Sequence, residues 1–282
     1  MSKPVKVKFY PSAMTIAGSD SGGGAGIAAD LRTFNAFGVF GTCAITAVTA
    51  QNPAAVRQIC LMDAQTVTDQ IDAVREKIPV KYVKTGMLGS AQTVHAVAQA
   101  VKKYNFKLIC DPVMISTSGS KLLADDAAAV MQTGLFPLAA WITPNIPEAE
   151  FLTGSKITSV NAMLDAATAL QQKYQAAVWL KGGHLSGNAA VDVIVKDGKR
   201  FTLSSPLLDL RPLTTHGTGC TLSAALTAML ALEMPWKQAV CAAKAFVFGS
   251  LEQCVDLGPG IQAMYPATED FIQLIKLAEA EK

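Results

Sequence analysis

The chain has little of what metal-binding, nucleic-acid-binding and membrane-spanning proteins need. Only three histidines and no C-x-x-C pair occur in its 282 residues, which argues against a Cys/His zinc site. Charged residues make up 16% and the net charge is +2 without a basic stripe, so no nucleic-acid partner is expected. No window approaches about 18 uninterrupted apolar residues, so no transmembrane helix is expected. The lysines of residues 1–12 precede no long apolar stretch, which argues against a signal peptide.

Two common nucleotide-binding motifs are missing as well. No G-x-x-x-x-G-K-[ST] sequence occurs, so any nucleoside triphosphate would bind without a P-loop. Gly24, Gly26 and Ala29 formally match the G-x-G-x-x-A dinucleotide fingerprint, but that fingerprint needs an acid about twenty residues further on. Residues 31–62 contain neither Asp nor Glu. The NAD interpretation therefore fails, although the glycines still indicate a backbone that approaches a ligand closely.

Apolar residues are abundant instead. They make up 50% of the chain, which is long enough to bury a sizeable core. We predict a single domain over residues 1–282, with residues 1–12 as an N-terminal extension. Several of the six cysteines stand inside apolar runs, so the simplest interpretation is a reduced, cytoplasmic protein.

Short β-like runs alternate with longer Ala-rich helical runs, which is typical of an α/β fold with a mostly parallel sheet and helices on both faces. The predicted strands cover residues 14–17, 42–50, 82–84, 107–110, 141–143 and 177–181. The predicted helices cover residues 24–37, 64–76, 91–104, 124–135 and 160–174, and two more, 219–232 and 236–255, close the chain. Asp197-Gly198, between residues 191–195 and 200–203, predicts an antiparallel hairpin at an edge of the sheet. In such folds ligands bind beyond the carboxyl ends of the strands.

The stretch from Thr215 to Ser223 is the most informative of the chain. Gly217-Thr218-Gly219 stands at the start of an apolar helical run, and Cys220 follows. Glycine lets a ligand approach the backbone, and the first amides of a helix have no partner within it. With the helix dipole these amides make a site for phosphate, and they favour a thiolate at Cys220. The alternative is an ordinary helix start with a small buried cysteine.

Further polar clusters follow the predicted strands. Asp111 ends one strand, where an acid can hold Mg²⁺ or accept a proton, and Pro112 makes a helix N-cap a poor alternative. Glu148 and Glu150 come near a helix start and could simply complement its dipole, which we prefer for Glu150. Lys181-Gly182-Gly183-His184 ends another strand.

Together these motifs resemble those of the hydroxymethylpyrimidine/phosphomethylpyrimidine kinases of thiamine biosynthesis, in the family's order and between about residues 14 and 260. The resemblance rests on residues 17–27, Ala29-Asp30-Leu31, Thr46-Ala47, Ala50-Gln51-Asn52, Lys84-Thr85-Gly86-Met87-Leu88, Asp111-Pro112-Val113-Met114, Thr143-Pro144-Asn145 with Glu148-Ala149, Leu180-Lys181-Gly182-Gly183-His184 and residues 216–225. It implies a ribokinase-like, three-layer αβα fold. It also implies ATP- and Mg²⁺-dependent phosphorylation of 4-amino-5-hydroxymethyl-2-methylpyrimidine and then of its monophosphate.

The resemblance also implies substrate-binding residues. It places the pyrimidine among Gly18, Ala25, Asp30, Gln51, Met87, Val113 and Cys220. Asp30 can accept a hydrogen bond from an exocyclic amino group, and Gln51 offers both a donor and an acceptor to a ring edge. Met87 and Val113, which by themselves would be ordinary core residues, supply apolar faces for a flat ring.

The phosphate side of the reaction is implied in the same way. Asp111, Glu148 and Lys181 fall near the nucleotide phosphates and Mg²⁺, with Asp111 and Glu148 as metal ligands, and Asn145 is placed near the phosphates too. The backbone amides of Gly217 to Cys220, including those of Thr218 and Gly219, are expected to form an anion hole for the transferring phosphoryl group.

Cys220 occupies the place where the wider ribokinase superfamily has an Asp general base. A helix N-terminus can lower the pKa of a thiol to about 7 or below. We therefore expect a thiol poised to remove the proton of the substrate hydroxyl at neutral pH.

Two other functions stay open at this point. Pyridoxal kinases have the same fold, and pyridoxal is a similar hydroxymethyl heterocycle. Ser21 and Ala28 replace the Pro and Gln that many family members carry beside the substrate pocket, which leaves the substrate preference open. A non-catalytic protein that binds thiamine precursors would need neither the acids nor Cys220. The apolar composition and the habits of relatives favour a homodimer.

Overall fold

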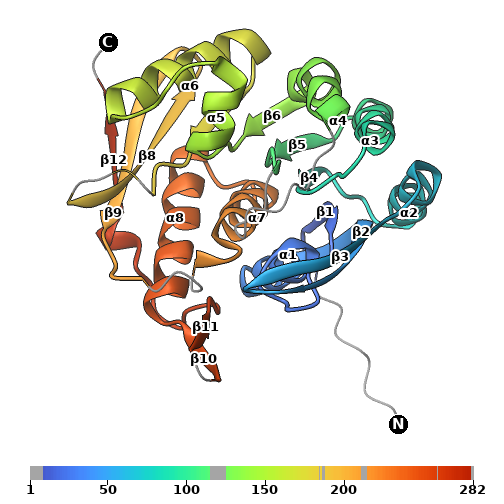
Figure 1. Cartoon of the computed structure of the whole chain (residues 1–282), viewed down its shortest axis with the longest axis horizontal. Coiled ribbons are helices and arrows are strands. Elements are labelled where there is room, and N and C mark those ends of the chain that lie inside the picture. Colours follow the sequence, from blue (N-terminus) through green and yellow to red (C-terminus); the bar gives the residue numbers. More distant parts are fainter. Residues whose placement is uncertain are drawn as a thin grey trace.

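The structure is a computed structural model of the chain and describes residues 9–114, 125–183, 185, 188–210, 215–258 and 260–280. His184 of the predicted Lys181–His184 cluster and Ala124 at the predicted start of a helix lie outside these residues. The described part forms one ten-stranded sheet with helices on both faces and a separate two-stranded ribbon (Figure 1). The predicted three-layer αβα fold is confirmed.

The strands of the large sheet run parallel in its centre and antiparallel at both ends. In sheet order they are β12 (Lys276–Glu279), β9 (Lys199–Pro206), β8 (Ala189–Lys196), β7 (Ala177–Leu180), β6 (Ala139–Ile142), β5 (Lys107–Cys110), β4 (Tyr82–Thr85), β1 (Ser12–Gly18), β2 (Phe40–Asn52) and β3 (Ala55–Leu61). All pairings from β7 through to β2 are parallel, and β3, β8, β9 and β12 pair antiparallel. The carboxyl ends of the central strands therefore share one edge of the sheet, where ligands bind in such folds.

Helices cover both faces of this sheet. They are α1 (Gly26–Ala36), α2 (Ala64–Lys77), α3 (Ala91–Tyr104), α4 (Asp125–Val130), α5 (Ile146–Thr153), α6 (Val160–Tyr174), α7 (Thr218–Ala231) and α8 (Trp236–Glu252). Helices α2 to α6 lie on one face, and α1, α7 and α8 lie on the other (Figure 1). Residues alternate between the two cores along each strand, as a period of two requires. On β7, for example, Val178 and Leu180 join the core under α2 to α6, whereas Trp179 joins the core under α7 and α8.

The helix starts follow from local sequence. Asp63, Ser90, Asn145 and Ser159 each accept a backbone N–H of the first turn and so begin α2, α3, α5 and α6. In contrast, α1 and α7 have no side-chain cap. The first amides of α7 therefore stay available to a ligand, and both helices begin at the carboxyl edge of the sheet.

Three parts of the chain differ from the prediction. β3 was not predicted because its turn lacks glycine; instead, Asn52 Oδ1 accepts the amides of Ala54 and Ala55 at 2.9 and 3.0 Å and reverses the chain. The prediction that two helices close the chain is wrong, because β10 (Val255–Gly258), β11 (Ile261–Ala263), a 3₁₀ turn and β12 follow α8. The hairpin of β8 and β9 is confirmed, but β12 pairs with β9 and forms the outer edge.

The predicted helix over residues 124–135 is also only partly regular. It is α-helical as far as Val130, and residues Met131–Leu135 form a π-helical turn. Among the helices that the structure describes, none has both the length and the apolar character needed to cross a bilayer.

Candidate active site

A glycine-rich turn joins β1 to α1 at the carboxyl edge of the sheet. Gly26 has a φ of 55°, and a Cβ on it would overlap the carbonyl oxygen of Gly18. A Cβ on Gly18 would lie 3.2 Å from Met87 Sδ, so the thioether stands directly beside this turn. Ala25 is the N-terminal flanking residue of α1. The structure thus brings together Gly18, Ala25 and Met87, three of the residues predicted to bind the pyrimidine.

The N-terminus of α7 adjoins this turn. Gly217 is left-handed, with a φ of 84°, and a Cβ on it would overlap the carbonyl oxygen of Gly24, so the two glycine turns touch. A Cβ on Gly219 would lie 3.3 Å from the Nζ of Lys181. The uncapped first turn of α7, with Thr218, therefore stands beside a cation, as an anion-binding site requires.

Asp111 is buried just beyond the end of β5. Its Oδ1 lies 2.7 Å from Lys181 Nζ and accepts the Thr143 hydroxyl, and its Oδ2 accepts the hydroxyl of Ser223 at 3.2 Å. Burial alone raises the pKa of Asp111, but the charges of Lys181 and Lys84 and these hydrogen bonds hold it below its usual range. Asp111 is thus a carboxylate at neutral pH, and Ser223 links it to α7.

Glu148 and Asn145 form a reciprocal capping box at the start of α5. Asn145 Oδ1 accepts the amide of Glu148, and Glu148 Oε2 accepts the amide of Asn145, both at 2.8 Å. Burial raises the pKa of Glu148 to about 7; Lys181 opposes this rise and Asp111 adds to it. Glu148 is thus a helix cap, and its nearness to Lys181 and Asp111 is also compatible with a role as an acid of the phosphate site. Glu150, in contrast, accepts the Ile157 amide at 2.8 Å beyond the helix.

A buried acid on β8, Asp192, fixes the backbone directly after Lys181. Asp192 Oδ1 accepts the amide of Gly182 at 2.9 Å, and its Oδ2 accepts Trp179 Nε1 at 3.0 Å and Lys244 Nζ at 2.8 Å. The backbone that follows Lys181 is thereby fixed against the antiparallel half of the sheet. Burial lowers the pKa of Lys181, but Asp111 and Glu148 raise it more, so the ammonium stays charged.

Cys220 lies in the first turn of α7, where Gly26 of α1 donates its amide to the thiol. The expected low pKa is wrong. Burial raises the pKa of the Cys220 thiol above its usual range, and Asp30 and Asp111 add to the rise, whereas Lys84 and the Gly26 amide lower it too little to compensate. The sulfur is therefore a thiol at neutral pH.

Asp30 is fully buried on α1 and does not reach open space. Lys84 Nζ contacts its two carboxylate oxygens at 2.7 and 2.9 Å, and Thr15 donates to Oδ2 at 2.6 Å. Burial raises the pKa of Asp30 and Lys84 opposes it; burial lowers the pKa of Lys84, but Asp30 and its acidic neighbours raise it above its usual range. In this structure Asp30 is thus the counterion of Lys84, and the predicted hydrogen bond to substrate has no accessible acceptor oxygen.

The two remaining predicted residues, Gln51 and Val113, each contact another residue of the site. Gln51 lies at the end of β2, and its amide nitrogen is 3.4 Å from His216 Nε2. Val113 is half-buried two residues after Asp111, whose carbonyl accepts the Val113 amide at 2.8 Å.

Four residues of the site carried no predicted role, namely Asp20, Lys84, His216 and Ser223. All four stand inside motifs that were singled out, so only their partners were unknown. Ser223 follows Gly219 by four residues and so lies on the same side of α7. That spacing could have identified it from the sequence.

The acids suit a divalent cation that is shared with phosphate. Asp111 and Glu148 lie close enough for Asp111 to raise the pKa of Glu148. Mg²⁺ commonly takes one or two carboxylates and completes its shell with water and substrate phosphates. No group of three or more Cys, His, Asp or Glu residues arranged for a metal occurs within the described ranges. The donor set therefore fits an ion that arrives with a nucleotide rather than one that the protein holds alone.

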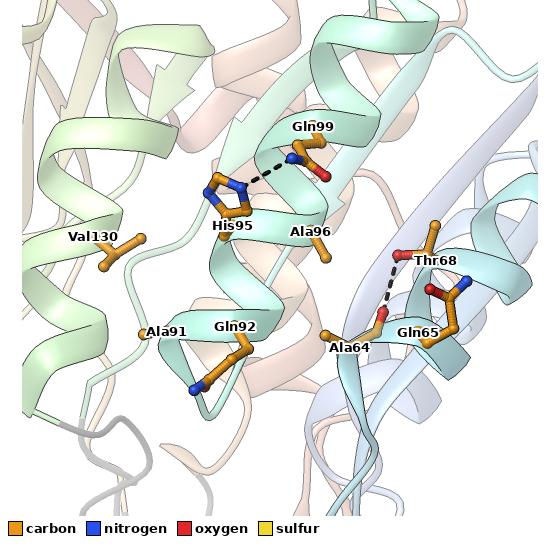
Figure 2. Close-up of a pocket in the computed structure, with 9 residues that line it drawn as sticks. All are labelled: Ala64, Gln65, Thr68, Ala91, Gln92, His95, Ala96, Gln99 and Val130. Carbon is orange, nitrogen blue, oxygen red and sulfur yellow. Dashed lines mark hydrogen bonds between the residues drawn. The ribbon is translucent and has the colours of Figure 1, made fainter.

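A separate groove, whose lining includes none of these residues, lies between α2 and α3. It has a volume of about 540 Å³, and Figure 2 shows Gln65, Thr68, Gln92, His95 and Gln99 along it. His95 Nε2 is 2.9 Å from the amide of Gln99, and the lining carries neither an acid nor a lysine or arginine. The groove thus has none of the groups that phosphate chemistry needs.

Comparisons with known proteins agree with this geometry. The sequence model of the family described as phosphomethylpyrimidine kinase matches residues 20–265. The chain belongs to this family. The hydroxymethylpyrimidine/phosphomethylpyrimidine kinase of Haemophilus influenzae is 46% identical over 253 residues, which cover 88% of this chain and 93% of that protein. The resemblance read from the strand-end motifs is therefore confirmed.

Solved structures show the same fold. A phosphomethylpyrimidine kinase from Clostridium difficile is 42% identical, with a TM-score of 0.74 over 84% of this chain and 97% of that one. The pyridoxal kinase of Bacillus subtilis, solved as an ADP complex, is 34% identical, with a TM-score of 0.84 over 92% of this chain and 98% of that one. The ribokinase-like fold is thus common to both kinds of kinase, whereas sequence identity is higher to the pyrimidine kinase.

Proposed function

We propose that this protein transfers the γ-phosphoryl group of ATP to the hydroxymethyl oxygen of 4-amino-5-hydroxymethyl-2-methylpyrimidine, and then phosphorylates the monophosphate at the same site. The observation that carries this proposal is the convergence of an uncapped helix N-terminus with Lys181, Asp111 and Cys220. Family membership and the ADP bound to a relative support both the reaction class and the use of ATP.

The phosphoryl group is stabilised by groups that are in place before it arrives. The amides at the start of α7 and the Nζ of Lys181 present positive charge where negative charge accumulates during transfer. Lys181 needs no rearrangement, because Asp111 holds its Nζ and Asp192 holds the following backbone. Asn145 lies beside Lys181, because the two residues pair in an isolated parallel β-bridge.

Asp111 and Glu148 would hold Mg²⁺ together with the nucleotide phosphates. When bound, the ion supplies charge neutralisation and a template for the phosphate oxygens. Glu148 then has to be ionised, and because its pKa is raised to about 7 the carboxylate becomes the major form only as the pH rises past about 7.

The acceptor ring is proposed to bind at the turn between β1 and α1, which touches the start of α7. Met87 and Val113 offer apolar faces, Gly18 and Ala25 let the ring approach the backbone, and Gln51 reads a polar ring edge. Asp30 supports this pocket through Lys84 rather than through direct contact, because both of its oxygens are occupied.

Cys220 Sγ is the proposed acceptor of the hydroxyl proton. Since its pKa is raised, only a minor thiolate fraction is present at neutral pH, and Lys84 and the Gly26 amide are the groups that stabilise it. Turnover is then expected to follow the thiolate fraction of Cys220.

Mass spectrometry of the pyrimidine incubated with ATP, Mg²⁺ and the protein tests the proposal. The product is expected to gain one phosphoryl group and then a second. Pyridoxal is the second candidate substrate, because a pyridoxal kinase shares the fold over 92% of the chain. A phosphorylated pyridoxal with an unchanged pyrimidine would replace the first candidate by the second.

Two further properties belong to this proposal. A homodimer is supported by exposed apolar side chains on the β2–β3 edge, where Phe40, Val48 and Leu61 are 58%, 48% and 46% exposed. Size-exclusion chromatography with light scattering tests the homodimer, and a mass of one chain would show that this proposal is wrong. A cytoplasmic location is supported by six cysteines that are all free.

A further inference from the structure

One polar cluster at the site has no role in the chemistry described above. Asp20 lies just after β1, and His216 directly precedes the Gly217 turn of α7. His216 Nε2 is 2.8 Å from Asp20 Oδ2, and the two side chains are only 10% and 2% exposed. This contact, which we term the clasp, joins residues that are 196 positions apart in the sequence.

Asp20 organises the whole glycine-rich turn. Its Oδ1 accepts the amide of Gly22 at 2.8 Å, and its Oδ2 accepts the amides of Gly24 and Ala25 at 3.1 and 2.9 Å as well as His216. Burial raises the pKa of Asp20, but the hydrogen bonds from His216 and from the amides hold it below its usual range. Asp20 is therefore an acceptor only, so His216 Nε2 must carry the hydrogen of the clasp.

This tautomer fixes the orientation of Gln51. A protonated Nε2 has no lone pair for the Gln51 amide nitrogen that faces it at 3.4 Å, so turning the Gln51 amide over, with Oε1 toward His216, removes a contact between two donors. The nitrogen then faces the Thr49 hydroxyl at 3.3 Å, and that hydroxyl is free to accept because its own proton goes to the Ser19 carbonyl at 2.8 Å. Every donor in the chain from Asp20 to Ser19 then meets an acceptor.

The clasp also sets the spacing of the two glycine turns. A Cβ on Gly24 would lie 2.7 Å from His216 Cδ2, and one on Gly217 would overlap the Gly24 carbonyl. No side chain fits between the turns at these two glycines, and the hydrogen bond between Asp20 and His216 is a side-chain link that helps to keep the turns in register. One turn lines the pocket of the ring and the other begins the phosphate site.

We propose that Asp20 and His216 are positioning residues that hold the ring pocket in register with the α7 N-terminus and fix the amide of Gln51 in one orientation. With the amide fixed, the order of donor and acceptor offered to a ring edge is set before binding. The pocket then selects a ring whose edge presents the complementary order. This inference rests on the proposed function, because it concerns recognition of the acceptor ring.

Steady-state kinetics of four variants test the clasp. His216→Leu removes the donor and Asp20→Asn replaces an acceptor by a donor, and each is expected to raise the KM for the pyrimidine by about tenfold or more, as for the loss of a hydrogen bond to a charged group. The KM for ATP is expected to change by less than about twofold, since Lys181 and Asp111 lie outside the clasp. The variant that combines both changes is expected to be no worse than the poorer single one.

A conservative variant at His216 distinguishes a positioning role of this residue from a role in the stability of the fold. His216→Gln retains an N–H near the place of Nε2 and is expected to recover most of the affinity for the pyrimidine. His95→Leu is the matched control, because His95 is an exposed histidine bonded to a neighbouring amide on α3 (Figure 2). It is expected to leave both KM values unchanged.

The outcomes are distinguishable from failure of the proposed function. If the wild-type protein does not phosphorylate the pyrimidine, the proposed function fails. If the wild type is active but His216→Leu keeps its KM for the pyrimidine, or if both KM values rise equally, the clasp proposal is overturned. Should His216→Leu not fold, Asp20→Asn and His216→Gln carry the same comparison.

Discussion

The buried pair of Lys84 and Asp30 allows the sharpest test of the energetics. Both side chains have no exposed surface, and Lys84 Nζ contacts both carboxylate oxygens. Replacing Lys84 by Met leaves the Asp30 carboxylate buried with the Thr15 hydroxyl as its remaining side-chain donor. Removing one partner of a buried ion pair typically costs about 3–5 kcal/mol, because the other charge is left uncompensated.

This range translates into a shift in the melting temperature. An unfolding entropy of about 2.1 cal/mol/K per residue gives about 0.6 kcal/mol/K for a chain of this length. The Lys84→Met variant is therefore expected to melt about 5–8 °C below the wild type. Differential scanning calorimetry at pH 7 measures this shift directly.

Two controls make the result interpretable. Lys103→Met removes a lysine that contacts Asp72 at a similar distance, 2.8 Å, but lies 56% exposed, and it is expected to have little effect. The double variant Lys84→Met with Asp30→Asn removes the stranded charge while keeping an acceptor for Thr15, and should regain most of the lost stability. The reasoning about the pair is refuted if Lys84→Met has the melting temperature of the wild type. It is also refuted if the double variant is no more stable than Lys84→Met.

Three further predictions concern the reaction. Cys220→Ala is expected to lower kcat at least about tenfold while ATP binding, followed by calorimetry, survives, since Cys220 is assigned to the proton and not to the nucleotide. Because the pKa of Cys220 is raised, the thiolate fraction grows with pH. Above about pH 8, where Glu148 is already ionised, kcat of the wild type should rise about tenfold per pH unit and Cys220→Ala should lack this rise; a flat wild-type profile there contradicts the base assignment. Asp192→Asn leaves Lys244 without its counterion and weakens the bond to the amide of Gly182, which follows Lys181. It should therefore lower the melting temperature and also raise the KM for ATP. An unchanged KM for ATP would refute the proposed positioning of Lys181.

The fold was largely predictable because its signals are local. Strands such as β5 and helices such as α3 and α6 have the residue bounds that the apolar pattern predicts. The strand-end motifs also placed Asp111, Glu148 and Lys181 at one edge of the sheet, since parallel strands must end there. The strands that the sequence did not predict, such as β3 and β12, are mainly antiparallel. β3 depends on a turn made by Asn52, and β12 depends on pairing with β9, which is distant in the chain.

Electrostatics could be predicted less well than position. The helix N-terminus and the glycines around Cys220 predicted a lowered pKa, but the structure adds burial and two carboxylates, Asp30 and Asp111, which reverse the direction. Asp30 itself reads as a free acceptor in the sequence and proves to be paired with Lys84. In both cases the deciding neighbour comes from a distant segment, so no local pattern could reveal it.

The measurement that bears most directly on the central claim is kcat/KM of the wild-type protein for the aminopyrimidine, its monophosphate and pyridoxal, determined side by side with ATP and Mg²⁺. The arrangement of Lys181, the α7 amides and Cys220 predicts ATP-dependent turnover, and the higher identity to pyrimidine kinases predicts that both pyrimidines are used more efficiently than pyridoxal. Turnover of pyridoxal without turnover of the pyrimidines would contradict the substrate. Absence of ATP-dependent turnover on all three, with ligand binding intact, would contradict the kinase.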